Sequence, residues 1–175
     1  MPSKSRFKSS RWKPGMVYAV PLLDGSYCYA QAISEAMPTV IDVAVFRTRT
    51  EHMPIEPPGL QRNDVIVLSA TWRQALNRGD WAALGVTDLI VDRLDMPNQQ
   101  LLDAGTTVGI KHSDSGIFES LLNAWYGLEP WNVSYNENYF DERLAPGVTR
   151  PDSAVVLSPS ERELHRAQLL IKKST

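Results

Sequence analysis

The N-terminal part of the chain is dominated by two apolar runs, residues 16–23 and 27–32, which are separated by Asp24-Gly25. An Asp-Gly pair between apolar runs is typical of a two-residue hairpin loop, because glycine accepts the positive φ that such a turn needs. In this hairpin Leu22 would pair with Tyr27, and both faces of the strand pair would be largely apolar. A sheet with one face in water alternates apolar and polar residues instead. We therefore expect the hairpin to be covered on both faces, or to curl into a partly closed barrel.

Further apolar runs predict additional strands. Residues 39–46 predict a third strand that continues the hairpin as a meander, and residues 64–69 fit a short buried strand. Residues 72–84 would form a short helix or a loop. Pro21 cannot donate a hydrogen bond to a sheet, which places the first strand near an edge. Three shorter runs are further strand candidates: residues 88–92, 106–110 and 153–157.

From residue 115 onward the apolar positions follow a helical period instead. They form one stripe, made of Ile117, Phe118, Leu121, Leu122 and Trp125. Ser113 or Asp114 would cap the start of this helix, and Gly127 stands where a C-terminal glycine belongs. Residues 138–144 predict a second, short helix.

The last helix is predicted from its start signals. Pro159 takes the first helical position, and Ser158 with Glu161 matches a capping box. Leu164, Gln168 and Ile171 fall roughly on one face, so this helix can dock against the rest of the protein.

These elements together predict an α+β fold. It would be a bent, mainly antiparallel sheet or a partly closed barrel, with helices from the C-terminal half. The chain has 175 residues, which suits a single domain, and we assign residues 14–175 to it. Residues 1–13 carry five basic residues and no acidic one, so we expect a flexible basic tail, and the rest of the chain has a formal charge of −7. An acidic body argues against a nucleic-acid partner, which needs a basic face.

The cysteine count and the hydropathy restrict the environment. Cys28 is the single cysteine, which excludes an intramolecular disulfide and zinc sites built on cysteine pairs. Its place in a packed strand indicates a small buried thiol. No apolar stretch reaches the length of a membrane span, and the N-terminus lacks the apolar core of a signal peptide. We expect a cytoplasmic protein with no membrane partner.

No catalytic, metal or cofactor site is predicted. The three histidines lack the helical spacing of a metal-binding pair, and the chain has neither a nucleophile elbow nor a glycine-rich phosphate loop. Asp88, Asp92 and Asp95 could form a carboxylate cluster, although a solvated edge after a strand explains them more simply. The histidines are His52, His112 and His165.

Six aromatic residues between positions 125 and 140 are the remaining signal. Trp125 and Trp131 are expected in the core between helix and sheet, whereas Tyr135 and Tyr139 are left open between core and interface. Acidic side chains surround them, which suggests an acidic, aromatic surface for a basic partner. The candidate partner-binding residues are Glu129, Tyr135, Glu137, Tyr139, Asp141 and Glu142.

Two separated segments give the chain a family resemblance. The first is the hairpin from Gly15 to Gln31, with its Val-Pro-Leu-Leu-Asp-Gly centre. The second is the stretch Leu122-Asn-Ala-Trp-Tyr-Gly-Leu-Glu-Pro-Trp131, followed by Asn138-Tyr-Phe-Asp141 and Val155-Val-Leu157. Together they resemble immunity protein family twenty-six of bacterial polymorphic toxin systems. This resemblance implies a small cytoplasmic protein that binds and neutralises a cognate, co-encoded toxin without catalysis and without a cofactor.

Two rival functions stay open at this stage. Some relatives carry a phosphotriesterase label, which suggests a small hydrolase acting on organophosphates, although such a centre needs clustered histidine and acidic ligands. The basic tail with aromatic residues could instead form a nucleic-acid-binding small-barrel module. An exposed edge at the Pro21 strand would also permit a homodimer.

Overall fold

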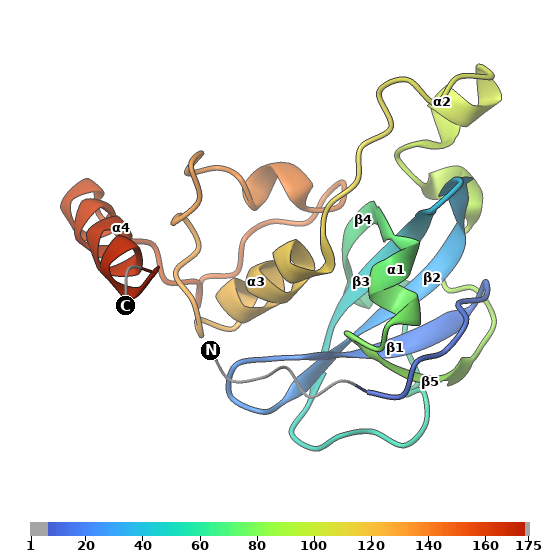
Figure 1. The fold of residues 1–175 in the computed structure, drawn as a ribbon, viewed down its shortest axis with the longest axis horizontal. Helices are drawn as coiled ribbons and strands as arrows, with labels where there is room; N and C mark the ends of the chain where they lie inside the picture. Colours follow the sequence, from blue (N-terminus) through green and yellow to red (C-terminus); the bar gives the residue numbers. More distant parts are fainter. Residues whose placement is uncertain (1–6, 174–175) are drawn as a thin grey trace.

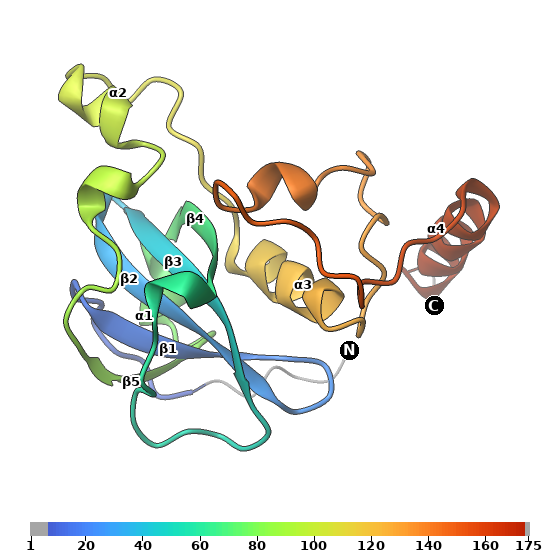
Figure 2. The same ribbon diagram turned by 180° about the vertical axis from the view of Figure 1, so that it is seen from behind.

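The computed structural model describes residues 7–173, with side chains as far as residue 168, and it has an α+β fold (Figures 1 and 2). Its centre is a five-stranded sheet in the order β4-β3-β2-β1-β5, and all neighbouring strands are antiparallel. The sheet is open, which confirms the α+β prediction in its open-sheet form. The strands are β1 Met16–Pro21, β2 Tyr27–Met37, β3 Val40–Thr50, β4 Val65–Trp72 and β5 Ala82–Val86. The helices are α1 Arg73–Asn77, α2 Gln99–Asp103, α3 Ser115–Trp125 and α4 Pro159–Lys173, with 3-10 turns η1 Arg62–Asp64, η2 Arg93–Asp95 and η3 Asp141–Arg143.

The β1–β2 hairpin has a three-residue loop, so the predicted pairing of Leu22 with Tyr27 is wrong by one residue. Tyr27 pairs with Pro21 instead. The Leu22 N–H donates to the Ser26 carbonyl oxygen over 2.8 Å, and Gly25 takes φ +85°. A left-handed glycine at the third loop position is the usual way to close a three-residue hairpin. The Asp-Gly pair lies between the apolar runs with either loop length. The sequence pattern therefore does not distinguish the observed three-residue loop from the predicted two-residue loop.

Both faces of the sheet are covered, as the apolar pattern predicted. On one face α3 packs against β3, and Phe118, Leu121 and Leu122 are fully buried there in a core shared with residues of β1 and β2. Cys28 lies in the same core with its side chain wholly shielded from solvent, as expected for a structural thiol. The other face buries Val17, Ile33, Ala44 and Phe46 beneath loop residues Leu60, Val91, Met96 and Ala145.

The two edges of the sheet are β4 and β5. β1 lies between β2 and β5, so it is not an edge strand, although β5 pairs only with Met16–Ala19 and stops short of Pro21. The outer side of β4 accepts two backbone hydrogen bonds, from Ala145 to Ile66 and from Ser113 to Ala70. The loops after α2 and η3 are thereby fastened to the sheet.

The end of α3 and the start of α4 follow their predicted signals, whereas Asp114 stands at the N-cap position of α3 without a side-chain capping hydrogen bond. After α3, the Leu128 N–H donates to the Asn123 carbonyl over 2.8 Å while Gly127 takes φ +70°, which is a Schellman motif. At the start of α4, Glu161 accepts from the Ser158 N–H over 2.8 Å in a capping box.

Docking of α4 through its apolar face is not observed, because Leu164 is 61% exposed. Figures 1 and 2 show α4 on the far side of α3 from the sheet. Ile171 lies outside the described side chains.

Three predicted strands and one predicted helix are not formed. Residues 88–92 and 106–110 are irregular, and residues 153–157 run beside residues 131–132 with a single backbone hydrogen bond, from Trp131 to Val155. The helix predicted over residues 138–144 is reduced to the 3-10 turn η3. Burial differs among these segments: Val91 is 1% and Phe140 is 3% exposed and both are held by loop packing, whereas Val108 is 82% and Val156 is 50% exposed.

Residues 7–12 lie along the turn between α1 and β5. The Phe7 N–H donates to the Gly79 carbonyl over 3.0 Å, and the Trp12 N–H donates to Asn77 Oδ1 over 2.9 Å. Part of the predicted basic tail is therefore attached to the domain, whereas residues 1–6 lie outside the described residues.

Candidate partner-binding surface

The aromatic stretch contains a buried layer and an exposed layer. Trp131 is fully buried and Trp125 nearly so, which confirms that both belong to the core. The Trp131 ring lies 6.3 Å from that of Trp125 and 5.5 Å from that of Phe140, measured between centroids. Residues 133–140, which connect Trp131 to Phe140 of this cluster, extend to the surface between them. We call this segment the tyrosine loop.

Tyr135 is the most exposed aromatic residue of the described chain, with 85% of its surface accessible. Its ring makes an edge contact with Tyr139, with centroids 5.4 Å apart. The Arg143 guanidinium lies over the Tyr139 ring, 3.4 Å from its centroid, and also donates to the Tyr139 carbonyl over 2.9 Å. Tyr135 is thus exposed but supported from beneath by an arginine–tyrosine stack.

Helix α4 braces the same loop with two arginines. Arg162 forms an ion pair with Glu137 at 2.7 Å, and Arg166 donates to the Ser134 carbonyl over 3.0 Å. The Arg162 side chain is only 14% exposed. Because α4 contacts the loop through these polar groups, the helix and the tyrosine loop form one surface.

The acidic residues predicted around the tyrosines are mostly paired within the chain. Glu137 faces Arg162, Asp141 lies 3.8 Å from Arg150, and Glu142 accepts from Asn136 over 2.8 Å. The surface therefore carries charges of both signs. The arginines were missed by the sequence analysis, because nothing local in the sequence links them to partners up to 32 residues away.

Glu129 differs from the other candidates because it is half-buried beside α4. Burial raises the pKa of the Glu129 carboxyl, while a hydrogen bond from Ser120 and the nearby His165 act in the opposite direction. Of the six candidate residues, the structure joins Tyr135, Tyr139, Glu137 and Glu142 in and beside the tyrosine loop. Asp141 lies below it, and Glu129 faces α4 through His165.

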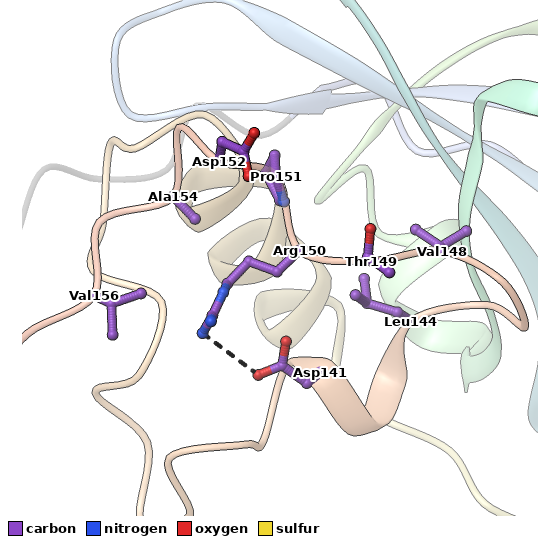
Figure 3. Close-up of a pocket in the computed structure, with 9 residues that line it drawn as sticks. All are labelled: Asp141, Leu144, Val148, Thr149, Arg150, Pro151, Asp152, Ala154 and Val156. Carbon is purple, nitrogen blue, oxygen red and sulfur yellow. Dashed lines mark ion pairs between the residues drawn. The ribbon is translucent and has the colours of Figure 1, made fainter.

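A hollow of about 580 Å³ opens beside Asp141 (Figure 3). Apolar side chains of Leu144, Val148, Ala154 and Val156 line it, and the Asp141–Arg150 ion pair spans one side. Arg150 remains 41% exposed and its ion pair is long, so its guanidinium can turn to a second acceptor. The hollow suits an apolar side chain that carries or adjoins an acceptor group.

The three histidines do not meet. His52 lies on the exposed loop after β3, His112 makes an edge contact with Trp72 at 4.2 Å, and His165 is on α4. Within residues 7–173 no group of three or more histidine, cysteine or acidic side chains is placed to hold a metal ion. The same part of the chain contains no helix that is both long and apolar enough to cross a membrane.

Comparison with known families assigns the chain. Residues 13–107 match the family model of Immunity protein 26, and this protein belongs to that family. The matched residues include the β1–β2 hairpin and all five strands, whereas the tyrosine loop and α4 lie beyond them. Neither a curated protein nor a solved structure matches the chain.

Proposed function

We propose that this protein neutralises a bacterial toxin by direct, non-catalytic binding, and that Tyr135 is the central contact. Membership of the Immunity protein 26 family supports a toxin-neutralising role in general. The observation that supports this particular surface is the 85% exposure of an aromatic side chain on a loop held by Arg143, Arg162 and Arg166.

An exposed tyrosine offers a large contact area with few rotatable bonds, and such residues are enriched among interface anchors. The arginine contacts hold the loop before the partner arrives, so less conformational freedom is lost on binding. Tyr139, Glu137 and Glu142 would surround the anchor, while the half-buried Asp141 and Glu129 would support the surface from within.

The proposal is tested with the toxin domain encoded beside the gene for this chain, inactivated at its catalytic residue. Truncating the anchor in Tyr135→Ala should raise Kd roughly 30-fold, equivalent to about 2 kcal/mol. Ile55→Ala is the matched control, because Ile55 is 94% exposed on the loop after β3. Equal affinity of both variants for the toxin would refute the assignment of the interface.

Stoichiometry separates binding from catalysis. If the protein blocks the toxin by binding, the activity of the native toxin should fall linearly and reach zero near one chain per toxin. Complete protection by a small fraction of that amount would point to an enzyme and refute the non-catalytic mechanism.

A further inference from the structure

Two exposed carboxylates without an ion pair to any described residue lie away from the tyrosine loop, on the segment that follows β5. Residues 87–95 contain three aspartates and one arginine, and we call them the acidic segment. Asp95 pairs with Arg62 at 2.9 Å. Asp88 and Asp92 are exposed and make no ion pair with any described residue.

A buried glutamine of the sheet holds the acidic segment in place. Gln31 on β2 is fully buried, and its Nε2 donates to Thr87 Oγ1 over 2.9 Å and to the Asp88 carbonyl over 2.8 Å. Its Oε1 accepts from the Ile90 N–H over 3.0 Å. The side-chain amide thus takes the place of a strand partner for this stretch, which explains why an apolar run is fixed without forming a strand.

Hydrophobic burial fixes the same segment further along. Val91 and Met96 are almost completely buried in the core on the second face of the sheet. Val91 is turned inward, whereas Leu89, two positions before it, is 45% exposed and Leu94, three positions after it, is 69% exposed. Asp92 Oδ1 accepts from the Leu94 N–H over 2.9 Å and so starts the turn η2 on which Leu94 is presented.

We propose that the acidic segment is a second docking surface, which receives a basic patch of the toxin around Leu89 and Leu94. This inference rests on the proposed function and adds the chemistry of the partner. Charge complementarity selects the occupant, because two unpaired carboxylates next to exposed leucines favour lysine or arginine side chains whose apolar stems cover the leucines. The fixed backbone keeps the entropy lost on binding small.

The two surfaces have different kinetic roles. The tyrosine loop has its charges balanced within the chain, so it contributes mainly to the lifetime of the complex. The acidic segment supplies long-range attraction, which raises the association rate and weakens as salt screens it. The acidic segment and the tyrosine loop share no residue, so the two can be tested separately.

The test compares two pairs of substitutions that remove the same charge. Asp88→Asn with Asp92→Asn keeps an acceptor for the Leu94 N–H and should lower the association rate for the inactivated toxin domain roughly five- to ten-fold at low salt. Glu51→Gln with Glu56→Gln removes two exposed carboxylates from the loop after β3 and should change the rate less than two-fold. Leu94→Ala should raise the dissociation rate several-fold.

The outcomes separate the two proposals. Equal association rates for the two charge variants, in a complex that Tyr135→Ala still weakens, would refute the acidic segment and leave the proposed function intact. If the unchanged protein fails to bind the toxin domain, both proposals are refuted. Self-association of the chain that Leu94→Ala abolishes would assign the segment to a second copy and would also refute the inference.

Discussion

The indole N–H of Trp131 donates to Asp141 Oδ2 over 3.1 Å, which ties the fully buried tryptophan to a carboxylate at the rim of the hollow. Asp141 therefore has a structural role in addition to any contact with a partner. The same oxygen lies 3.8 Å from the Arg150 guanidinium. Substitutions of Asp141 thus need to be interpreted first through the stability of the fold.

Asp141→Ala should lower the free energy of unfolding by about 1–3 kcal/mol, because it leaves a buried donor without its acceptor. Asp141→Asn retains a carbonyl oxygen for the indole and should lose clearly less. Urea denaturation followed by tryptophan fluorescence measures both values. Equal losses for the two variants would show that the hydrogen bond contributes little to stability.

The buried carboxyl of Asp42 should make the stability of the protein fall as the pH rises. This β3 carboxyl is 1% exposed, and burial raises its pKa above the ordinary value of 3.8, against the opposing hydrogen bond from Ser34. The folded state therefore binds the proton more tightly than the unfolded state does. The resulting cost to stability is absent below the unfolded-state pKa and grows as pH rises through the folded-state value.

Asp42→Asn removes this cost while keeping an oxygen that can accept from Ser34. We expect the variant to be more stable than the unchanged protein at pH 7, and the difference to shrink as the pH approaches 4. Thermal unfolding across this pH range measures the difference. A difference that is constant with pH would contradict the titration of Asp42.

Gly79 controls the attachment of residues 7–12. It takes φ +78°, and a Cβ placed there would lie 2.2 Å from the Phe7 carbonyl oxygen. Gly79→Ala should therefore release this segment and cost about 1–2 kcal/mol of stability. Limited trypsin digestion should cut the variant sooner after Lys8 and Arg11, both of which are exposed.

Gly59→Ala provides the control for this experiment. Nothing lies within 4 Å of a Cβ at Gly59, and its φ is not in the left-handed region. This variant should be digested at the rate of the unchanged protein. Similar acceleration in both variants would show that the attachment does not depend on the close approach at Gly79.

The parts of the fold that follow from local sequence signals were predictable. The apolar stripe from Ile117 to Trp125 and the glycine at position 127 specify α3 and its end, and Ser158 with Glu161 specifies the start of α4. These signals act within a few residues, so they can be identified in the chain itself.

The remaining features depend on contacts between distant residues. Ile90 and Val91 look like strand residues, but Gln31, 59 residues earlier in the chain than Ile90, bonds the Ile90 N–H and the Asp88 carbonyl oxygen. Likewise, Arg162 and Arg166 convert a predicted acidic surface into one of mixed charge through partners 25 and 32 residues away. Periodicity carries no information on such pairings, which is why the tyrosine loop was only partly anticipated.

The burial of Cys28 also bears on how the protein can be studied. Its side chain is wholly enclosed, and burial raises the pKa of the thiol to about 12, so at neutral pH it is neither accessible nor ionised. A cysteine introduced at the exposed position Gln168 on α4 would then be the one thiol that reacts readily with a maleimide dye. A fluorophore there would report whether α4 keeps its orientation when the tyrosine loop is occupied.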